Sequence, residues 1–448
     1  MYAVIGAGPM GLAAARNLSK HGIPFTGFEQ HSEVGGLWDI DNPHSTMYET
    51  AHLISSKGTT QFAEFPMPAS VATYPHHAEM RQYFRDYARH FDLYRHYEFS
   101  TRVVRVEPDG DGWRVITEAK GQQTVRHFDG VLIANGTLHH PNLPKLPGEF
   151  AGELIHSSEY RSPRQLAGKR VLIVGCGNSG ADIAVDAVHH AAKVDISLRR
   201  GYYFVPKFIF GRPTDTLGGR LKLPRRLKQL LDGLLVRAVM GKPSQYGLPD
   251  PDYRMYESHP VMNSLILHYL GQGDVGPRPD IAAIDGHRVT FKDGSRGEYD
   301  LILLATGYKL HYPFIDRAEL NWPESAGAPQ LYLNVFHPRY DNLFMMGMVE
   351  ATGLGWEGRN EQAELVALFI RGLAQGVPAA AKIKALKMRS AAERIDGGYR
   401  YLKLERMAYY VHKDTYRAAV LAHSRELRRD LAASGAAASA GSHVKPAA

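Results

Sequence analysis

The sequence predicts a doubly wound α/β fold in two parts, and two glycine-rich loops are the main reason. Residues 6–11 read Gly-Ala-Gly-Pro-Met-Gly and residues 175–180 read Gly-Cys-Gly-Asn-Ser-Gly, so the pattern G-x-G-x-x-G occurs twice, 169 residues apart. Each loop follows a short apolar run typical of a buried strand and opens a stretch typical of a helix. This setting indicates two Rossmann-like dinucleotide-binding domains in one chain.

The first loop has the features of a site for a nucleotide without a 2′-phosphate. Gly6 is expected to make the tight turn, Gly8 to let a pyrophosphate approach the backbone, and Gly11 to let the helix pack on the strand. The helix N-terminus offers N–H groups and a partial positive charge to the phosphates. The next strand, residues 25–28, leads into Glu29. Its carboxylate would accept hydrogen bonds from the ribose hydroxyls and would repel a 2′-phosphate. The loop therefore suits FAD or NAD rather than NADP.

The second loop is followed by a different strand end. The strand at residues 194–198 leads directly into Arg199 and Arg200, with no carboxylate at that position. Guanidinium groups bind phosphates through forked, charge-assisted hydrogen bonds, so we expect NADPH at this loop. The alternative for both arginines is a solvated strand end.

The composition fits a globular enzyme. The chain has 448 residues, 44% hydrophobic and 22% charged, which suits two or three domains. The net charge of +7 comes with no nucleic-acid-binding motif, and two anionic nucleotides account for a basic interior, so we predict no nucleic-acid partner. The only cysteine, Cys176, excludes an internal disulfide and a CxxC redox pair. The 22 histidines show no metal-ligand spacing, and we predict no metal.

The sequence also suggests a location. The first expected strand begins at residue 2, which leaves no room for a signal peptide. No apolar run reaches the ~18 residues of a membrane-spanning helix. We therefore expect a cytoplasmic protein with no membrane span. The sequence does not decide whether the chain forms a homodimer.

We expect the second domain to be inserted into the first. The FAD-binding domain is assigned to residues 1–166 and 297–430, and the NADPH-binding domain to residues 167–296. Two similar segments are each expected to close one nucleotide-binding unit: both read Tyr/Phe-Asp, four apolar residues and Ala-x-Gly. Residues 431–448 consist mostly of Ala, Ser and Gly and are predicted to be disordered. The two similar segments are residues 128–136 and 299–308.

A basic amphipathic helix is expected at residues 223–240. One interpretation is contact with a membrane surface or a substrate gate. The other, which we favour, is a helix that packs on its own domain or on a partner subunit, because apolar periodicity usually marks a core face.

A family resemblance adds to these predictions. Residues 150–160 resemble the FxGxxxHxxxY motif of flavin-containing monooxygenases, placed just before the second glycine loop as in that family. Related Baeyer–Villiger enzymes usually end this motif in Trp or Phe followed by Pro, whereas this chain has Tyr160-Arg161, which favours the branch that oxygenates heteroatoms. The resemblance covers residues 1 to about 375 and includes residues 35–38, Lys57 with 65–68, 177–182, 199–201, 305–308 and 347–362.

The resemblance implies two sets of cofactor-binding residues. FAD would be bound by Gly6, Gly8, Pro9, Met10, Gly11, Glu29, Gly36, Leu37, Trp38, Thr306 and Gln362. NADPH would be bound by Gly175, Gly177, Asn178, Ser179, Gly180, Arg199 and Arg200. His156 would link the domains rather than take part in chemistry.

The implied reaction is an FAD- and NADPH-dependent monooxygenation. NADPH would reduce FAD, O2 would form a C4a-hydroperoxyflavin, and the nitrogen or sulfur of a small amine or sulfide would take up one oxygen atom. The family carries an Asn three residues before the lysine aligned with Lys57, and this chain has Ile54 there; Ser55 and His52 are the candidates to replace it. The alternatives are an NADPH oxidase that releases H2O2, a Baeyer–Villiger ketone oxygenase, and a non-catalytic flavoprotein that senses NADPH.

Overall fold

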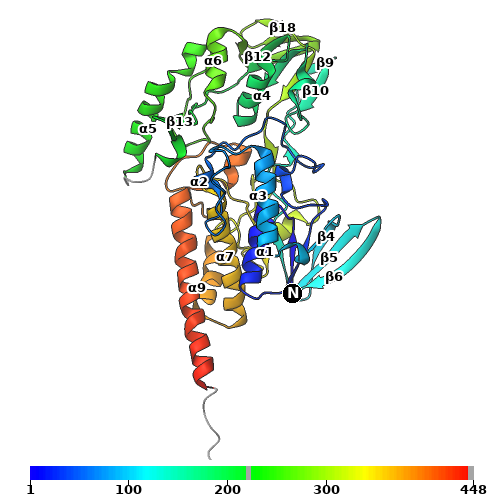
Figure 1. Cartoon of the computed structure of the whole chain (residues 1–448), viewed down its shortest axis with the longest axis vertical. Helices are drawn as coiled ribbons and strands as arrows, with labels where there is room; N and C mark the ends of the chain where they lie inside the picture. Colours follow the sequence, from blue (N-terminus) through cyan, green and yellow to red (C-terminus); the bar gives the residue numbers. More distant parts are fainter. Residues whose placement is uncertain (218–222, 442–448) are drawn as a thin grey trace, which may run out of the picture.

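Two parallel sheets organise the molecule. The computed structural model describes residues 1–217 and 223–441, with the second sheet at the top of Figure 1 and the first below it. The first sheet has the strand order β21-β7-β1-β2-β3 and the second has the order β10-β19-β11-β12-β15, with parallel pairing throughout. Their bounds are β21 Leu343–Met345, β7 Gly130–Ile133, β1 Tyr2–Ile5, β2 Phe25–Phe28, β3 Tyr97–Glu98, β10 Glu153–His156, β19 Leu301–Leu304, β11 Arg170–Val174, β12 Lys193–Ser197 and β15 Val275–Arg278.

Smaller antiparallel sheets surround these two. They are β4 Arg102–Asp109, β5 Gly112–Ala119 and β6 Gln122–Phe128; β9 Gly148–Phe150 beside β16 Ile281–Gly286, β17 Arg288–Phe291 and β18 Arg296–Glu298; β8 His140–Pro141 with β20 Tyr308–Lys309; and β13 Phe208–Ile209 with β14 Arg212–Pro213. In the β16-centred sheet, β9 is the parallel member. The helices are α1 Pro9–Lys20, α2 Lys57–Thr60, α3 His77–His90, α4 Asn178–Val188, α5 Arg225–Met240, α6 Leu265–Gln272, α7 Gly355–Ala374, α8 Pro378–Ser390 and α9 Lys413–Gly441.

Each sheet is buried because its strands are apolar on both faces. β7 and β19 are buried at every position, as expected for strands of a parallel sheet covered by helices. α1 presents small and apolar residues to β1 and to α7, and α7 is itself mostly buried between α1 and α9. The first core therefore holds the first glycine loop between a sheet and two helices.

The two nucleotide units repeat one another. β1 lies between β2 and β7, and β11 lies between β12 and β19, so the segments at residues 128–136 and 299–308 do pair with the two loop strands as predicted. The expected domain limits need correction, because β10 and β19 belong to the second sheet although both lie outside residues 167–296. The physical reason is that a glycine-loop strand needs a neighbour on each side, and β19 supplies one of them.

The expected disordered tail also needs correction. α9 extends to Gly441, so residues 431–441 are helical rather than disordered, while residues 442–448 lie outside the described residues. Alanine has the highest intrinsic helix propensity, which lets an Ala-rich segment continue a helix that is already formed.

Over the described ranges, no single helix is long and apolar enough to cross a membrane. α7 and α8 pass that test only as a pair, and they meet at a bend of 114°. Much of α7 is buried in the first core.

Candidate functional site: two matched nucleotide loops

The first glycine loop is shaped by a close approach between β1 and β7. Gly6 has a φ of +103° and donates its N–H to Phe28 O at 2.8 Å. A Cβ on Gly6 would lie 2.6 Å from Ala134 O, and one on Gly11 would lie 1.8 Å from Gly6 O. No side chain fits at either position, so the sequence requirement for glycine here is steric.

The second loop repeats this geometry closely. Gly175 has a φ of +100° and donates its N–H to Ser197 O at 2.9 Å. A Cβ on Gly175 would lie 2.6 Å from Ala305 O, and one on Gly180 would lie 2.1 Å from Gly175 O. Two loops of matching form support the sequence prediction of two dinucleotide sites.

The N-termini of α1 and α4 both have backbone N–H groups that no side chain caps. α1 begins after Gly8 and α4 begins after Gly177; neither helix has a side-chain cap or an acidic residue in its first turn. A Cβ on Gly177 would meet nothing within 4 Å, so the backbone faces open space there. Uncapped N–H groups beside open space fit a pyrophosphate group, which would accept hydrogen bonds and face the positive end of the helix dipole.

Glu29 lies at the end of β2, where the ribose of the first nucleotide is expected. The side chain is buried, and its carboxylate accepts hydrogen bonds from Ala7 N at 2.6 Å and from His31 N at 2.8 Å. Burial raises the pKa of this carboxyl, against the effect of the two N–H donors. The carboxylate is therefore fixed beside the loop that it is expected to serve.

The register shows what replaces Glu29 in the second unit. Ile5 pairs with Phe28, and Val174 pairs with Ser197, so the residue after Ser197 occupies the position equivalent to Glu29. That residue is Leu198, which is buried and carries no charge. Arg199 follows; it is exposed and makes no ion pair within the described residues, while Arg200 Nε lies 3.4 Å from Asp252 Oδ1. A second-site nucleotide would therefore meet cations rather than a carboxylate.

The turn at Gly36–Trp38 lies directly against the first loop. A Cβ on Gly36 would lie 2.9 Å from Gly8 Cα, and Gly36 has a φ of +58°. The Trp38 ring packs edge-on against Trp356 of α7, with a centroid separation of 6.1 Å. The predicted FAD residues of this turn and of the first loop are thus brought together.

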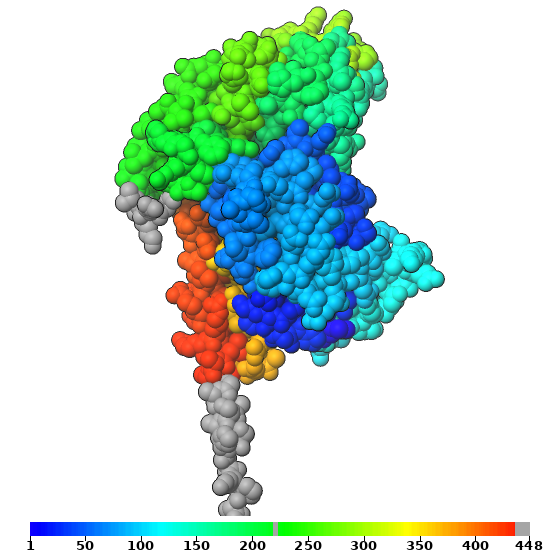
Figure 2. All heavy atoms as spheres, in the orientation of Figure 1, coloured from blue at the N-terminus to red at the C-terminus, as the bar shows by residue number. Residues whose placement is uncertain are grey.

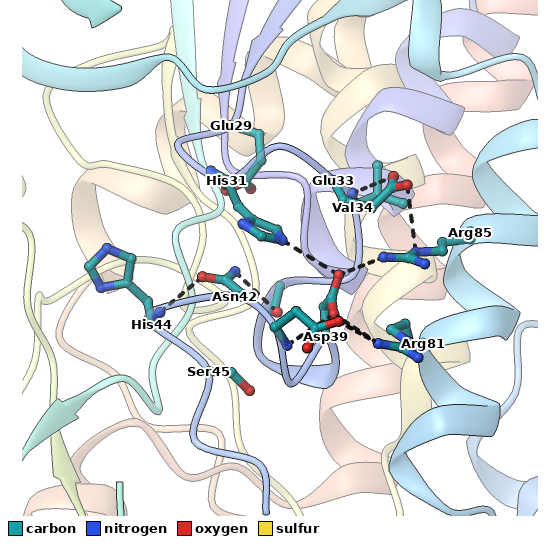
Figure 3. Close-up of polar contacts among 12 residues, drawn as sticks. Glu29, His31, Glu33, Val34, Asp39, Asn42, His44, Ser45, Arg81 and Arg85 are labelled. Carbon is teal, nitrogen blue, oxygen red and sulfur yellow. Dashed lines mark hydrogen bonds and ion pairs between the residues drawn. The ribbon is translucent and has the colours of Figure 1, made fainter. Parts of the chain in front are cut away.

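A buried carboxylate fixes this turn, and sequence reasoning missed it. Asp39 is fully buried, and Figure 3 shows it at the centre of a polar network. Its carboxylate accepts a hydrogen bond from Arg85 Nη2 at 2.8 Å and lies 3.5 Å from Arg81 Nη1 and from His31 Nε2. Arg85 also lies 3.6 Å from Glu33. α3 thereby anchors the backbone that immediately follows the turn.

Gln362 and Thr306, both predicted to lie near FAD, use their polar groups within the protein. Gln362 is fully buried; its Oε1 accepts from Gly347 N at 2.9 Å and its Nε2 donates to Tyr416 at 2.6 Å. Gly347 in turn packs against Met10, since a Cβ there would lie 2.8 Å from Met10 Cγ. The Thr306 hydroxyl donates to Asn142 O at 2.6 Å. Gln362 therefore supports Met10 of the first loop through Gly347.

Ile54 and Ser55 lie in a segment held by main-chain and side-chain contacts. Ile54 is half-buried, and the Ser55 hydroxyl lies 2.7 Å from Thr60 Oγ1. Lys57 Nζ donates to the carbonyls of residues 68, 69 and 71, and Asp215 of the second unit accepts from the backbone N–H of residue 56 at 2.7 Å. The sequence carries no signal for the Asp215 contact, because the two partners are 159 residues apart.

The central motif contains β10, which is the edge strand of the second sheet beside β19. His156 Nε2 donates to Gly307 O at 3.1 Å, and burial lowers the pKa of this histidine, which keeps the ring neutral. Tyr160 is fully buried, and its hydroxyl donates to Asp186 of α4 at 3.1 Å. Both contacts are made around the second sheet, and the linking role expected for His156 stays a prediction.

A short segment also ties the first site to α4. Ser45 donates its hydroxyl to Leu37 O at 2.5 Å, and Tyr48 donates its hydroxyl to Asp182 of α4 at 3.3 Å. Burial raises the pKa of the Asp182 carboxyl, which also accepts from Asn263 at 2.6 Å. The turn beside the first loop and the helix of the second loop therefore meet at one junction.

Cys176 is buried, and its thiol is not reactive. Burial raises the pKa of the Cys176 thiol to about 12, so it is not a nucleophile. Within residues 1–217 and 223–441, no group of three or more His, Cys, Asp or Glu side chains is arranged to hold a metal ion.

Comparison with known proteins agrees with this geometry. A family model described as flavin-binding monooxygenase-like matches residues 1–423. The chain belongs to this family. The human flavin-containing monooxygenase 5 is 30% identical over 423 residues, covering 89% of this chain and 78% of that protein. The rabbit (Oryctolagus cuniculus) dimethylaniline monooxygenase (N-oxide-forming) 2 is also 30% identical, covering 83% of this chain and 73% of that protein.

Solved structures show the same fold. An open crystal structure of cyclohexanone monooxygenase matches with a TM-score of 0.72 and 20% identity, over 96% of this chain and 98% of that one. S-allyl-L-cysteine S-oxygenase from Allium sativum matches with a TM-score of 0.61 and 20% identity, over 95% and 97% of the two chains. With the family established, the protein is an NADPH-dependent flavin monooxygenase whose cofactors are FAD and NADP(H).

The buried Asp39 network should control FAD affinity. Asp39→Asn removes the charge that holds Arg85, and we expect the Kd for FAD to rise about tenfold, equivalent to about 1.4 kcal/mol. Flavin fluorescence during titration of the apoprotein measures this. Asp41→Asn is the matched control, because Asp41 also pairs with Arg81, at 2.9 Å, but is 74% exposed. Equal Kd values for the two variants would contradict a positioning role for Asp39.

Arg199 should select NADPH over NADH. Arg199→Ala removes the exposed guanidinium at the strand end, and we expect the KM for NADPH to rise about tenfold, since a hydrogen bond to a charged group contributes about 1.5–3 kcal/mol. The KM for NADH should stay unchanged, because NADH has no 2′-phosphate. Steady-state kinetics with both nucleotides test this, and an equal rise for both would contradict it.

Proposed function

We propose that this protein oxygenates a soft nucleophile, the nitrogen of an amine or the sulfur of a sulfide, in a small molecule. The observation that carries the proposal is the junction at which Ser45 bonds the Leu37 carbonyl and Tyr48 bonds Asp182 of α4. This junction sets the turn beside the first loop next to the helix of the second. When bound, the two cofactors supply hydride transfer and oxygen activation, and the chain positions them and limits the access of water.

The relatives support this substrate class. A rabbit relative is named as an N-oxide-forming dimethylaniline monooxygenase, and one structural neighbour is named as an S-oxygenase of S-allyl-L-cysteine. The cyclohexanone monooxygenase neighbour leaves a ketone substrate as the alternative. Tyr160 at the end of the central motif favours the heteroatom branch, and its hydroxyl is bonded to Asp186 of α4.

The first unit's residues divide the work of binding. Gly6, Gly8 and Gly11 let the pyrophosphate of FAD come close to the backbone. Glu29 is held in place to accept hydrogen bonds from the ribose hydroxyls of FAD. The Gly36–Trp38 turn, held by Asp39, forms the part of the site nearest the first loop. No step requires an acid or base from these residues.

Ile54 is the position most relevant to coupling between NADPH use and product formation. Its side chain has no hydrogen-bonding group, the Ser55 hydroxyl lies within bonding distance of Thr60, and His52 is exposed with Nδ1 2.9 Å from Thr50 O. These candidates to replace an asparagine are therefore engaged or turned to solvent. We propose that part of the NADPH consumed yields H2O2 rather than product.

An Ile54→Asn variant tests this proposal. An added amide that bonds the activated oxygen or the nicotinamide nucleotide should lower the H2O2 formed per NADPH by about threefold, as expected for one net hydrogen bond. Ile54→Val is the control, because it changes packing without adding a polar group. NADPH consumption, H2O2 and oxidised sulfide or amine are measured together. An unchanged H2O2 fraction in Ile54→Asn would show that residue 54 does not set coupling.

A further inference from the structure

α5 turns its apolar side to solvent. The residues of α5 that face the protein include Gln229 and Val236, which are buried. The leucines lie on the opposite side, spaced at three and four residues, and are largely exposed: Leu227 42%, Leu230 58%, Leu231 44%, Leu234 53% and Leu235 44%. This helix therefore does not pack its apolar face on its own domain, and the other half of the preferred expectation, packing on a partner subunit, stays a prediction. An exposed stripe of this size indicates a binding surface.

Other exposed apolar side chains lie near these leucines along the chain. Val239 near the end of α5 is 45% exposed. Phe210, at the turn between β13 and β14, is 90% exposed, and Phe208 is 49% exposed. In Figures 1 and 2, α5 lies at the outer edge of the second unit, away from its parallel sheet. The exposed residues of this surface are not among those assigned to the two nucleotide sites, although Phe208 packs edge-on against Tyr74 of the first unit, with a centroid separation of 5.2 Å.

The charged residues of α5 indicate which kind of partner this surface binds. Residues 225–242 contain five Arg or Lys and one acidic residue. The acid, Asp232, accepts from Lys228 and from Tyr256 at 2.5 Å each. Arg226 and Arg237 are exposed, and by helical periodicity they lie along one edge of the leucine stripe. The surface is therefore apolar in the middle and basic at its edge.

We propose that α5 binds an anionic lipid surface, lying in the plane of the interface. A helix with leucines on one face and flanking Arg and Lys inserts its apolar side among acyl chains and places its cations at lipid phosphates. A second copy of the chain fits less well, because a self-complementary contact would bring the same basic edges together. This contact is peripheral, and it needs no helix that crosses the bilayer.

Vesicle cosedimentation of the FAD-loaded full chain tests the proposal. We expect the protein to pellet with phosphatidylcholine vesicles containing about 30% phosphatidylglycerol, to bind pure phosphatidylcholine far less, and to be released by salt. The double variant Leu230→Gln with Leu234→Gln, and separately Arg226→Glu with Arg237→Glu, should each weaken binding at least about tenfold. These exposed side chains lie outside the nucleotide sites, so NADPH oxidation should be unchanged.

Matched controls separate the surface from general effects. Met388→Gln on α8 removes another apolar side chain, which is 70% exposed, and Arg95→Glu reverses a cation that is 67% exposed; both should bind vesicles like the parent chain. Failure of the parent to bind anionic vesicles at low salt would overturn the proposal. So would unaltered vesicle binding by the leucine variant, and a leucine variant that only turns a dimer into a monomer in light scattering would assign the face to a second copy.

Discussion

The close approach of a neighbouring strand to each glycine loop is the constraint on which this structure depends. A Cβ on Gly6 would lie only 2.6 Å from the carbonyl oxygen of Ala134, and a Cβ on Gly175 would lie 2.6 Å from the carbonyl oxygen of Ala305. Any side chain at these positions would push β7 or β19 away and would tilt the helix that follows. The glycines therefore set the distance between strand, loop and helix N-terminus, and the phosphate-binding groups result from that spacing.

A second constraint joins the two units. The segment around Ser45 and Tyr48 bonds the turn beside the first loop and also the half-buried Asp182 of α4. Around the second sheet, His156 and Tyr160 tie the central motif to the end of β19 and to α4. Because these bonds end on half-buried carboxylates and main-chain carbonyls, breaking them leaves unpaired polar groups, which costs free energy and favours one arrangement of the two nucleotide sites.

Local patterns in the sequence predicted the two loops, their strands and the position of Glu29 at a strand end, because each depends on residues that are close along the chain. Contacts between distant residues were not predictable. Asp39 meets Arg85 only because α3 folds back on the turn, and Gln362 supports Met10 through Gly347. The domain limits were wrong because β19 completes the second sheet, and α5 exposes the face that periodicity alone would assign to a core.

Anaerobic reduction of the bound flavin tests the division of labour between the two loops most directly. In a Gly180→Ala variant, a Cβ would lie 2.1 Å from Gly175 O and would disturb only the second loop. We expect this variant to bind FAD like the parent chain. We also expect NADPH to bleach the flavin absorbance of the variant at least about tenfold more slowly than that of the parent chain. Loss of FAD from the variant, or reduction at the parent rate, would contradict the assignment of NADPH to the second loop.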